Sequence, residues 1–160
     1  ADALTFAQQK GSKELIDIWI ETMEEVRKLQ RFKNGDFKIM HFEDDAFLGE
    51  IYRKKFEEEG FVAKHLIQPR EGFLEEIEEF KPDLIITDIY MPEVDGYQLI
   101  EKIKNNKKLK EIPIIVLSNL KKEEVLDKVL KLGAEDYWML SEYRPSELVL
   151  KARNFLLNKA

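Results

Sequence analysis

Apolar and polar residues follow two alternating patterns along most of the chain. Five short runs are rich in apolar residues, and the third and fourth are continuously apolar, which is typical of strands buried on both faces of a sheet. These runs cover residues 37–42, 61–67, 83–87, 112–117 and 136–140. Five amphipathic stretches with helical spacing alternate with them. The stretches cover residues 46–59, 71–80, 97–106, 122–132 and 145–159.

This alternation predicts one α/β domain. Strands that are joined by helices need right-handed crossovers, which produce a parallel sheet with helices on both faces. Gly60 and Gly133 stand where two of the helices should end. The chain has 160 residues, 44% of them hydrophobic, which suffices for one core but not comfortably for two. We therefore expect a doubly wound, five-stranded parallel sheet over residues 37–160, flanked by five helices.

A further amphipathic helix is predicted before this domain, at residues 12–32. Its apolar stripe contains Leu15, Trp19, Met23, Val26 and Leu29, and is widened by Ile16, Ile18 and Ile20. Such a wide stripe must be buried against another surface. We expect residues 1–36 to form a short tail and this helix, which docks on the domain, forms a homodimer or acts as a coiled-coil linker.

Polar residues with oxygen atoms follow several of the predicted strands. Glu43, Asp44 and Asp45 follow the first, Asp88 follows the third and Ser118 follows the fourth. In open parallel sheets, ligands bind at this carboxyl edge. If the first and third strands are neighbours, Glu43, Asp44 and Asp88 converge, and they cannot all stay ionised without a counterion. Oxygen ligands alone favour Mg²⁺, and Asp88 beside it is a candidate nucleophile toward a phosphoryl group.

Composition excludes several other classes of protein. There are 26 basic and 32 acidic residues, for a net charge of −6, which argues against direct binding of nucleic acid. The chain has no cysteine, so disulfides, thiolate metal sites and cysteine nucleophiles are excluded. No apolar run reaches the roughly 18 residues of a membrane span, and the N-terminus lacks the pattern of a signal peptide. We expect a cytoplasmic protein without membrane contact.

Four motifs in order resemble the receiver domain of response regulators in two-component signalling. They are FEDD, KPDLIITDIYMPEVDGYQLI, IPIIVLSN and LGAEDY, and the resemblance spans residues 37–159. It implies a flavodoxin-like sheet with strand order 2-1-3-4-5. It also implies a phosphorelay protein, not an enzyme, that receives a phosphoryl group from a histidine kinase or phosphotransfer protein. We expect the output to pass to an unidentified downstream protein through direct contact.

The resemblance assigns roles at the carboxyl edge of the sheet. Glu43 and Asp44 match the acidic pair that binds Mg²⁺, with Asp45 as a neighbour of the ligands. Asp88 matches the phosphoacceptor, which also contacts the metal. The backbone carbonyl of Tyr90 matches a further metal ligand.

Further matches concern the switching residues. Ser118 matches the hydroxyl that hydrogen-bonds the phosphoryl group, and Tyr137 matches the aromatic residue that changes rotamer with it. Met91-Pro92 and Asp95-Gly96 match the loop that shapes the site. His41 and His65 fall within predicted strands and are interpreted as structural, and Trp138 as core packing.

One match fails, because Leu140 stands where the family has a lysine at the end of the fifth strand. Leucine has neither charge nor donor, so Lys121 or Lys122 substitutes for it, or signalling is altered. The alternative function is a degenerate receiver that acts as a constitutive docking module.

An enzyme on a related sheet is a third hypothesis, which the sequence disfavours. The acidic residues 43–45 would repel a flavin phosphate, so they argue against a flavodoxin. An aspartate-based phosphatase would need an acid where Tyr90 stands.

Overall fold

The computed structural model describes Thr5, Gln9 and residues 13–35 and 37–159. Apart from Thr5 and Gln9, the tail predicted at residues 1–11 lies outside this part. The domain is built on a five-stranded parallel sheet with the order β2-β1-β3-β4-β5, which confirms the expected topology. The strands are β1 (Lys38–Phe42), β2 (Val62–Leu66), β3 (Leu84–Thr87), β4 (Ile114–Ser118) and β5 (Asp136–Met139).

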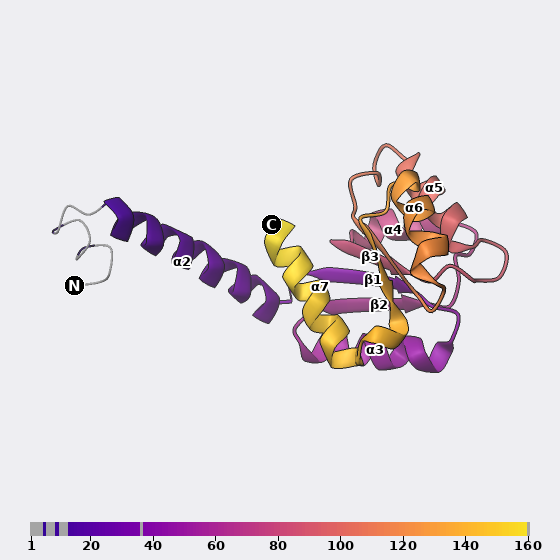
Figure 1. The fold of residues 1–160 in the computed structure, drawn as a ribbon, viewed down its shortest axis with the longest axis horizontal. Helices are drawn as coiled ribbons and strands as arrows, with labels where there is room; N and C mark the ends of the chain where they lie inside the picture. Colours follow the sequence, from indigo (N-terminus) through magenta and orange to yellow (C-terminus); the bar gives the residue numbers. More distant parts are fainter. Residues whose placement is uncertain (1–4, 6–8, 10–12, 36, 160) are drawn as a thin grey trace.

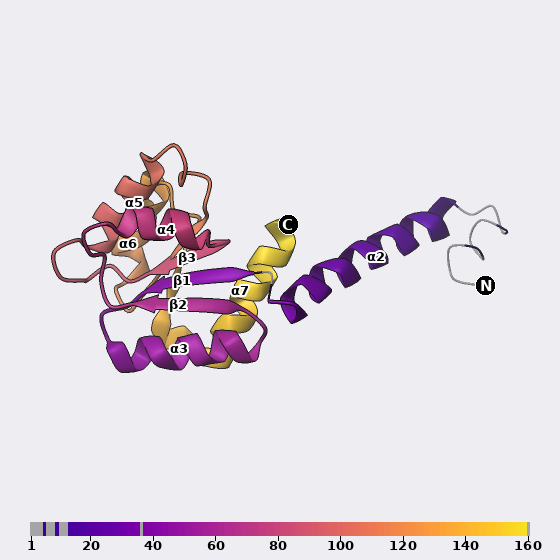
Figure 2. The same cartoon turned by 180° about the vertical axis from the view of Figure 1, so that it is seen from behind.

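Helices cover both faces of the sheet, as Figures 1 and 2 show. The helices are α2 (Lys13–Lys33), α3 (Ala46–Glu58), α4 (Phe73–Phe80), α5 (Gly96–Lys104), α6 (Lys122–Leu132) and α7 (Pro145–Lys159). Side chains of α4, α5 and α6 share one buried cluster with the sheet, and those of α3 and α7 share another. None of the helices in the described part of the chain combines the length and the hydrophobicity of a membrane span.

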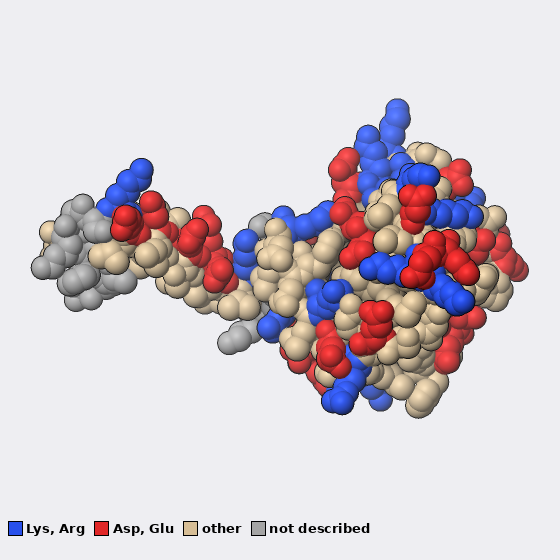
Figure 3. Space-filling view, viewed as in Figure 1, with Lys and Arg blue, Asp and Glu red and all other residues tan. Residues whose placement is uncertain are grey.

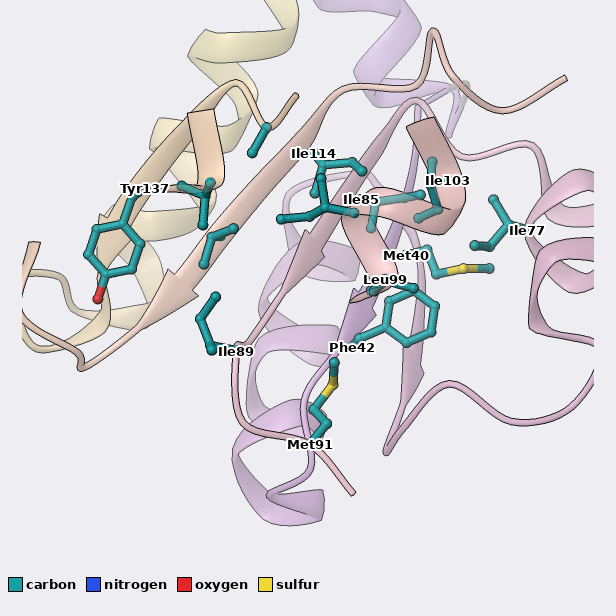
Figure 4. Close-up of a cluster of buried hydrophobic side chains, with 14 of the residues drawn as sticks. Met40, Phe42, Ile77, Ile85, Ile89, Met91, Leu99, Ile103, Ile114 and Tyr137 are labelled. Carbon is teal, nitrogen blue, oxygen red and sulfur yellow. The ribbon is translucent and has the colours of Figure 1, made fainter. Parts of the chain in front are cut away.

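Alternation along the strands divides the core into these two clusters. In β1, Met40 and Phe42 point to the α4, α5 and α6 side, which Figure 4 shows, whereas Ile39 points to the α3 and α7 side. Because both faces are buried, nearly every residue of the central strands is apolar. Trp138 in β5 is buried and packs edge-to-face against Phe155 of α7, which confirms its interpretation as a core residue.

His41 is the polar exception inside β1. It lies on the α3 side, where its ring packs edge-to-face against Tyr52. Neither ring nitrogen has a hydrogen-bond partner among the described residues. Burial, with the nearby His65, lowers the pKa of His41 to about 3, so the ring is neutral at pH 7.

Among the element boundaries that differ from the sequence prediction, three have a clear local cause. Strand β4 begins at Ile114, two residues late, because Pro113 has no N–H group to donate to the ladder. Helix α4 begins at Phe73, because Gly72 takes a left-handed conformation with φ of 82°. Strand β5 ends at Met139, and residues Leu140–Glu142 form a 3-10 turn. Gly60 and Gly133 have positive φ at helix ends, as predicted.

Helix α2 is present as expected and extends away from the α/β domain (Figures 1 and 2). It meets the domain near its C-terminal end. There Lys28 Nζ donates a hydrogen bond to the carbonyl oxygen of Leu157 at 3.1 Å. The guanidinium of Arg31 lies 4.3 Å from the centre of the Phe37 ring, which is a cation–π distance.

The start of α5 is held tightly against the end of β3. Asp95 caps α5 by accepting a hydrogen bond from the Gln98 N–H at 2.9 Å, and the Gln98 side chain accepts one from the Asp95 N–H in return. The N–H of Gly96 donates to the Ile89 carbonyl at 2.7 Å. A Cβ atom on Gly96 would collide with the Asp88 carbonyl oxygen, so glycine is needed for this close approach. The Asp95-Gly96 pair therefore fixes the backbone of Asp88.

We predict that Gly96→Ala lowers the free energy of unfolding by about 3 kcal/mol or more, because the new methyl group meets backbone atoms that cannot move aside independently. Gly72→Ala is the matched control. Nothing lies within 4 Å of its added Cβ, and its cost is the left-handed φ alone, about 1–2 kcal/mol. Urea denaturation of the two variants checks this, and equal losses of stability would contradict it.

Candidate functional site

Three carboxyl groups meet at the carboxyl edge of the sheet. Glu43 and Asp44 follow β1, and Asp88 follows β3. One ligand oxygen from each lies within 4.8 Å of the other two. Strands β1 and β3 pair directly, and the Asp88 N–H donates to the Phe42 carbonyl at 3.0 Å, so the residues that follow the two strands must lie side by side. The structure thus brings together the acidic residues that the sequence placed at one edge.

Burial makes this cluster electrostatically costly. Glu43 is 4% exposed, and burial together with the negative charge of Asp88 raises its pKa to about 8. Burial also raises the pKa of Asp88, although hydrogen bonds from the Ile89 N–H and the Ser118 hydroxyl oppose that shift. At pH 7 Glu43 therefore holds a proton, which reduces the repulsion among the three groups.

The donor set fits a hard divalent cation. All three side chains offer carboxylate oxygens, and a cation could take the place of the proton on Glu43. Tyr90 lies two residues after Asp88, and its N–H group acts to lower the pKa of the Asp88 carboxyl group. Its side chain is 68% exposed. A role of the Tyr90 carbonyl as a ligand stays a prediction.

Asp45 adjoins the cluster as a helix cap. Its carboxylate accepts a hydrogen bond from the Leu48 N–H at 3.0 Å, which begins α3 directly after the acidic pair. Its N–H donates to Glu43 Oε1 at 3.1 Å, which orients that carboxyl group. An aspartate directly before an amphipathic stretch is the sequence signal for such a cap, and this position agrees with the prediction that Asp45 neighbours the ligands.

Ser118 and Tyr137 connect Asp88 to β5. Ser118 is the last residue of β4 and is buried, and its hydroxyl acts to lower the pKa of Asp88. The hydroxyl of Tyr137 donates to the Ser118 carbonyl at 3.0 Å and also contacts the carbonyl of Leu120 closely. Figure 4 shows the Tyr137 ring at one side of the buried cluster. A change of charge or size at Asp88 would therefore reach Ser118 first and the Tyr137 hydroxyl next.

No cation takes the place of the family's lysine in the described part of the chain. Leu140 opens the 3-10 turn and packs partly buried against the cluster under α3 and α7. Lys121 and Lys122 are exposed at the start of α6. Among the described residues, the ion pairs within 4.0 Å include none with Glu43, Asp44 or Asp88. The proposed substitution by Lys121 or Lys122 thus has no contact to support it.

A side-chain bridge spans the loops that follow β4 and β5. Asn119 Oδ1 accepts a hydrogen bond from the N–H of Ser141 at 2.8 Å. It ties the residue after Ser118 to the turn that contains Leu140. This role of Asn119 is not visible in the sequence, because a contact between residues 22 positions apart leaves no periodic signal.

Comparisons with known proteins agree with this geometry. The family model of the response regulator receiver domain matches residues 39–151. The two-component response regulator ORR5 of Oryza sativa subsp. japonica is 40% identical over 65 residues, which cover 41% of this chain and 48% of that protein. A probable transcriptional regulator of Porphyra purpurea is 32% identical over 121 residues, covering 75% of this chain and 56% of that protein. The matched part thus spans about half the length of these relatives.

A solved structure shows the same fold. The signal receiver domain of a signal transduction histidine kinase from Syntrophus aciditrophicus has a TM-score of 0.66 and 29% identity to this chain. The match covers 78% of this chain and 92% of that domain. The family match over most of the chain, the strand order and the acidic cluster converge on one conclusion: this chain belongs to the response regulator receiver domain family.

Proposed function

We propose that this chain accepts a phosphoryl group on Asp88 from the phosphohistidine of a cytoplasmic histidine kinase or phosphotransfer protein. The observation that carries the proposal is the convergence of the Glu43, Asp44 and Asp88 carboxyl groups within 4.8 Å of one another. An Asp88 carboxylate oxygen attacks the phosphorus atom and forms an O–P bond. The P–N bond of the donor breaks, and the freed imidazole takes up a proton. The donor is consumed in this step, so the protein acts as a receiver and not as an enzyme with turnover.

Each acidic residue has a distinct task in this proposal. Glu43, Asp44 and Asp88 would hold Mg²⁺, with the Tyr90 carbonyl as a further ligand, and the ion would offset the negative charge of the phosphoryl oxygens. Asp88 supplies the nucleophile. One Asp88 carboxylate oxygen accepts a hydrogen bond from the Ile89 N–H at 2.6 Å, which orients the carboxyl group.

The new phosphoryl group would alter the surface near β5. Ser118 would donate its hydrogen bond to a phosphoryl oxygen, and the Tyr137 hydroxyl, held by carbonyls of the same loop, would move with it. A downstream protein would recognise that change by direct contact. With Leu140 in place of lysine, this path would depend on Ser118 and Tyr137 without help from a cation.

The second candidate function is a constitutive docking module. Leu140 favours it, because an apolar side chain packed under α3 and α7 cannot pair with a phosphoryl oxygen. In that case partner binding would be the same with and without a phosphoryl group on the protein.

We predict that the wild-type protein gains the mass of one phosphoryl group on incubation with Mg²⁺ and acetyl phosphate, and that Asp88→Asn gains none, because an amide is not a nucleophile toward phosphorus. Asp127→Asn is the control, since Asp127 is exposed and pairs with Lys131 on α6, away from the site. It should gain the group like the wild type. Intact-mass spectrometry measures all three, and a gain by Asp88→Asn, or none by the wild type, refutes the phosphoacceptor assignment.

We also propose that α2 pairs with α2 of a second copy in antiparallel orientation. Residues 13–25 contain five acidic residues and one basic residue, whereas residues 26–33 contain four basic residues and no acidic one. Figure 3 shows the acidic groups along the projecting part of the helix. Antiparallel pairing sets opposite charges side by side, whereas parallel pairing sets like charges together. Exposed apolar side chains, with Ile18 at 57% and Leu29 at 42%, would form the seam.

Cross-linking tests this orientation cleanly, because the chain has no cysteine of its own. We predict that Ile16→Cys and Gln30→Cys proteins, when mixed, link to each other with a short bismaleimide more efficiently than either links to itself. Sedimentation at rising concentration should show dimers in the unmodified protein. Preferential linking of like variants would establish a parallel pair, and monomers at all concentrations would exclude self-association through α2.

A further inference from the structure

His65 lies beside the acidic cluster, on the neighbouring strand. It belongs to β2 and pairs in register with His41 of β1. Its side chain is only 4% exposed, and its Nε2 atom lies 2.7 Å from the carbonyl oxygen of Glu43. Because a carbonyl oxygen can only accept, Nε2 carries the proton of this hydrogen bond. The position of His65 within a strand predicts a structural role, and its ring contacts the backbone of the acidic loop.

Residues of strand β2 form hydrogen bonds with both the backbone N–H and the backbone carbonyl of Glu43. The N–H of Glu43 donates to the Leu66 carbonyl at 3.0 Å, and its carbonyl accepts from His65. That carbonyl belongs to the peptide group between Glu43 and Asp44. The orientation of this one peptide plane sets the directions in which both acidic side chains leave the backbone. The hydrogen bond from His65 therefore acts on two carboxylates of the cluster together.

Gly49 in α3 makes room for the His65 ring. A Cβ atom on Gly49 would overlap with the ring atoms Cε1 and Nε2, which include the donor to Glu43. Glycine inside a helix costs about 1 kcal/mol relative to alanine, so a buried glycine there indicates a packing demand. On the other edge of the ring, Nδ1 lies 3.7 Å from Glu50 Oε1. The ring is thus clamped between α3 and the backbone of the acidic loop.

We propose that His65 is a positioning residue of the receiver site, which holds the Glu43–Asp44 peptide so that both carboxylates can bind the divalent cation. The inference rests on the proposed function, because it concerns the same acidic cluster. It adds a residue on β2, outside the acidic and switching residues, that acts through the backbone of two ligands. Groups that orient metal ligands in this way typically change metal affinity or activity 10–100-fold on mutation.

The variants separate the hydrogen bond from the bulk of the side chain. In His65→Leu the volume is similar but the donor is lost, and we expect the affinity for Mg²⁺ alone to fall about tenfold. His65→Gln keeps an N–H donor, and we expect it to recover most of that loss. His41→Leu is the matched control. His41 is the buried histidine of the adjacent strand, with no hydrogen-bond partner for its ring nitrogens in the described chain, so Mg²⁺ affinity should stay at the wild-type value.

Amide chemical shifts from NMR titrations with MgCl₂ give these affinities, and the same spectra show whether each variant is folded. Phosphorylation by acetyl phosphate supplies the second readout. At low Mg²⁺ His65→Leu should react more slowly than the wild type, and at saturating Mg²⁺ the two rates should converge. Because the same spectra report the folded fraction, a slower reaction of fully folded His65→Leu reflects weaker ion binding and not a loss of stability. If His65→Leu does not fold, the decisive value is the ratio of the Mg²⁺ affinity of His65→Gln to that of the wild type. This ratio should lie within about threefold of one.

The results distinguish this inference from the proposed function. Wild-type affinity in His65→Leu, or an equal loss in His41→Leu, overturns the role of His65 even if Asp88 is phosphorylated. An equal loss in His65→Gln and His65→Leu overturns it as well. A loss of affinity that depends on His65, in a protein that takes up no phosphoryl group, supports the positioning role and refutes the phosphoacceptor assignment. A wild-type protein that does not bind Mg²⁺ overturns both.

Discussion

Repulsion among three carboxyl groups is the constraint on which this site depends. The pairing of β1 with β3 brings Glu43, Asp44 and Asp88 within 4.8 Å of one another at the edge of the sheet. A fold tolerates such a cluster only if a proton or a cation offsets the charge. In this protein the pKa of Glu43 is raised to about 8, so its carboxyl group carries the proton at pH 7. In the function that we propose, a metal ion would replace this proton and would then help Asp88 to accept a phosphoryl group.

The residues around the acidic cluster hold the backbone of its members in place, and they contribute little positive charge to offset the carboxylates. Gly96 lets α5 close on the Asp88 carbonyl, Asp45 begins α3 at the acidic loop, and His65 holds the Glu43 carbonyl. At β4 and β5, Ser118 influences the pKa of Asp88, and the Tyr137 hydroxyl of β5 donates a hydrogen bond to the Ser118 carbonyl. Leu140 packs against the apolar cluster, so the coupling between Asp88 and the rest of the domain that we propose would pass through neutral groups.

The sequence predicted the regular parts of the fold because their signals are local. Continuous apolar runs marked β3 and β4, helical spacing marked α3 to α7, and the polar residues at strand ends marked the acidic cluster. The strand order needed the resemblance to a known family, because periodicity does not say which strands are neighbours. The roles of Gly49 and His65 were missed, since a contact between a helix glycine and a ring on another strand leaves no trace in spacing. Leu140 was placed at a strand end, whereas a 3-10 turn turns it toward the core.

The central claim is that a cation and a proton compete for one acidic cluster, and a titration with Mg²⁺ at several pH values tests it most directly. Amide shifts near Asp44 and Asp88 should saturate with one ion per chain. The affinity should rise with pH as Glu43 loses its proton and level off above about pH 8. In Glu43→Gln that dependence near pH 8 should disappear. Absence of saturable binding, or an affinity that does not change between pH 6 and 9, would contradict the account.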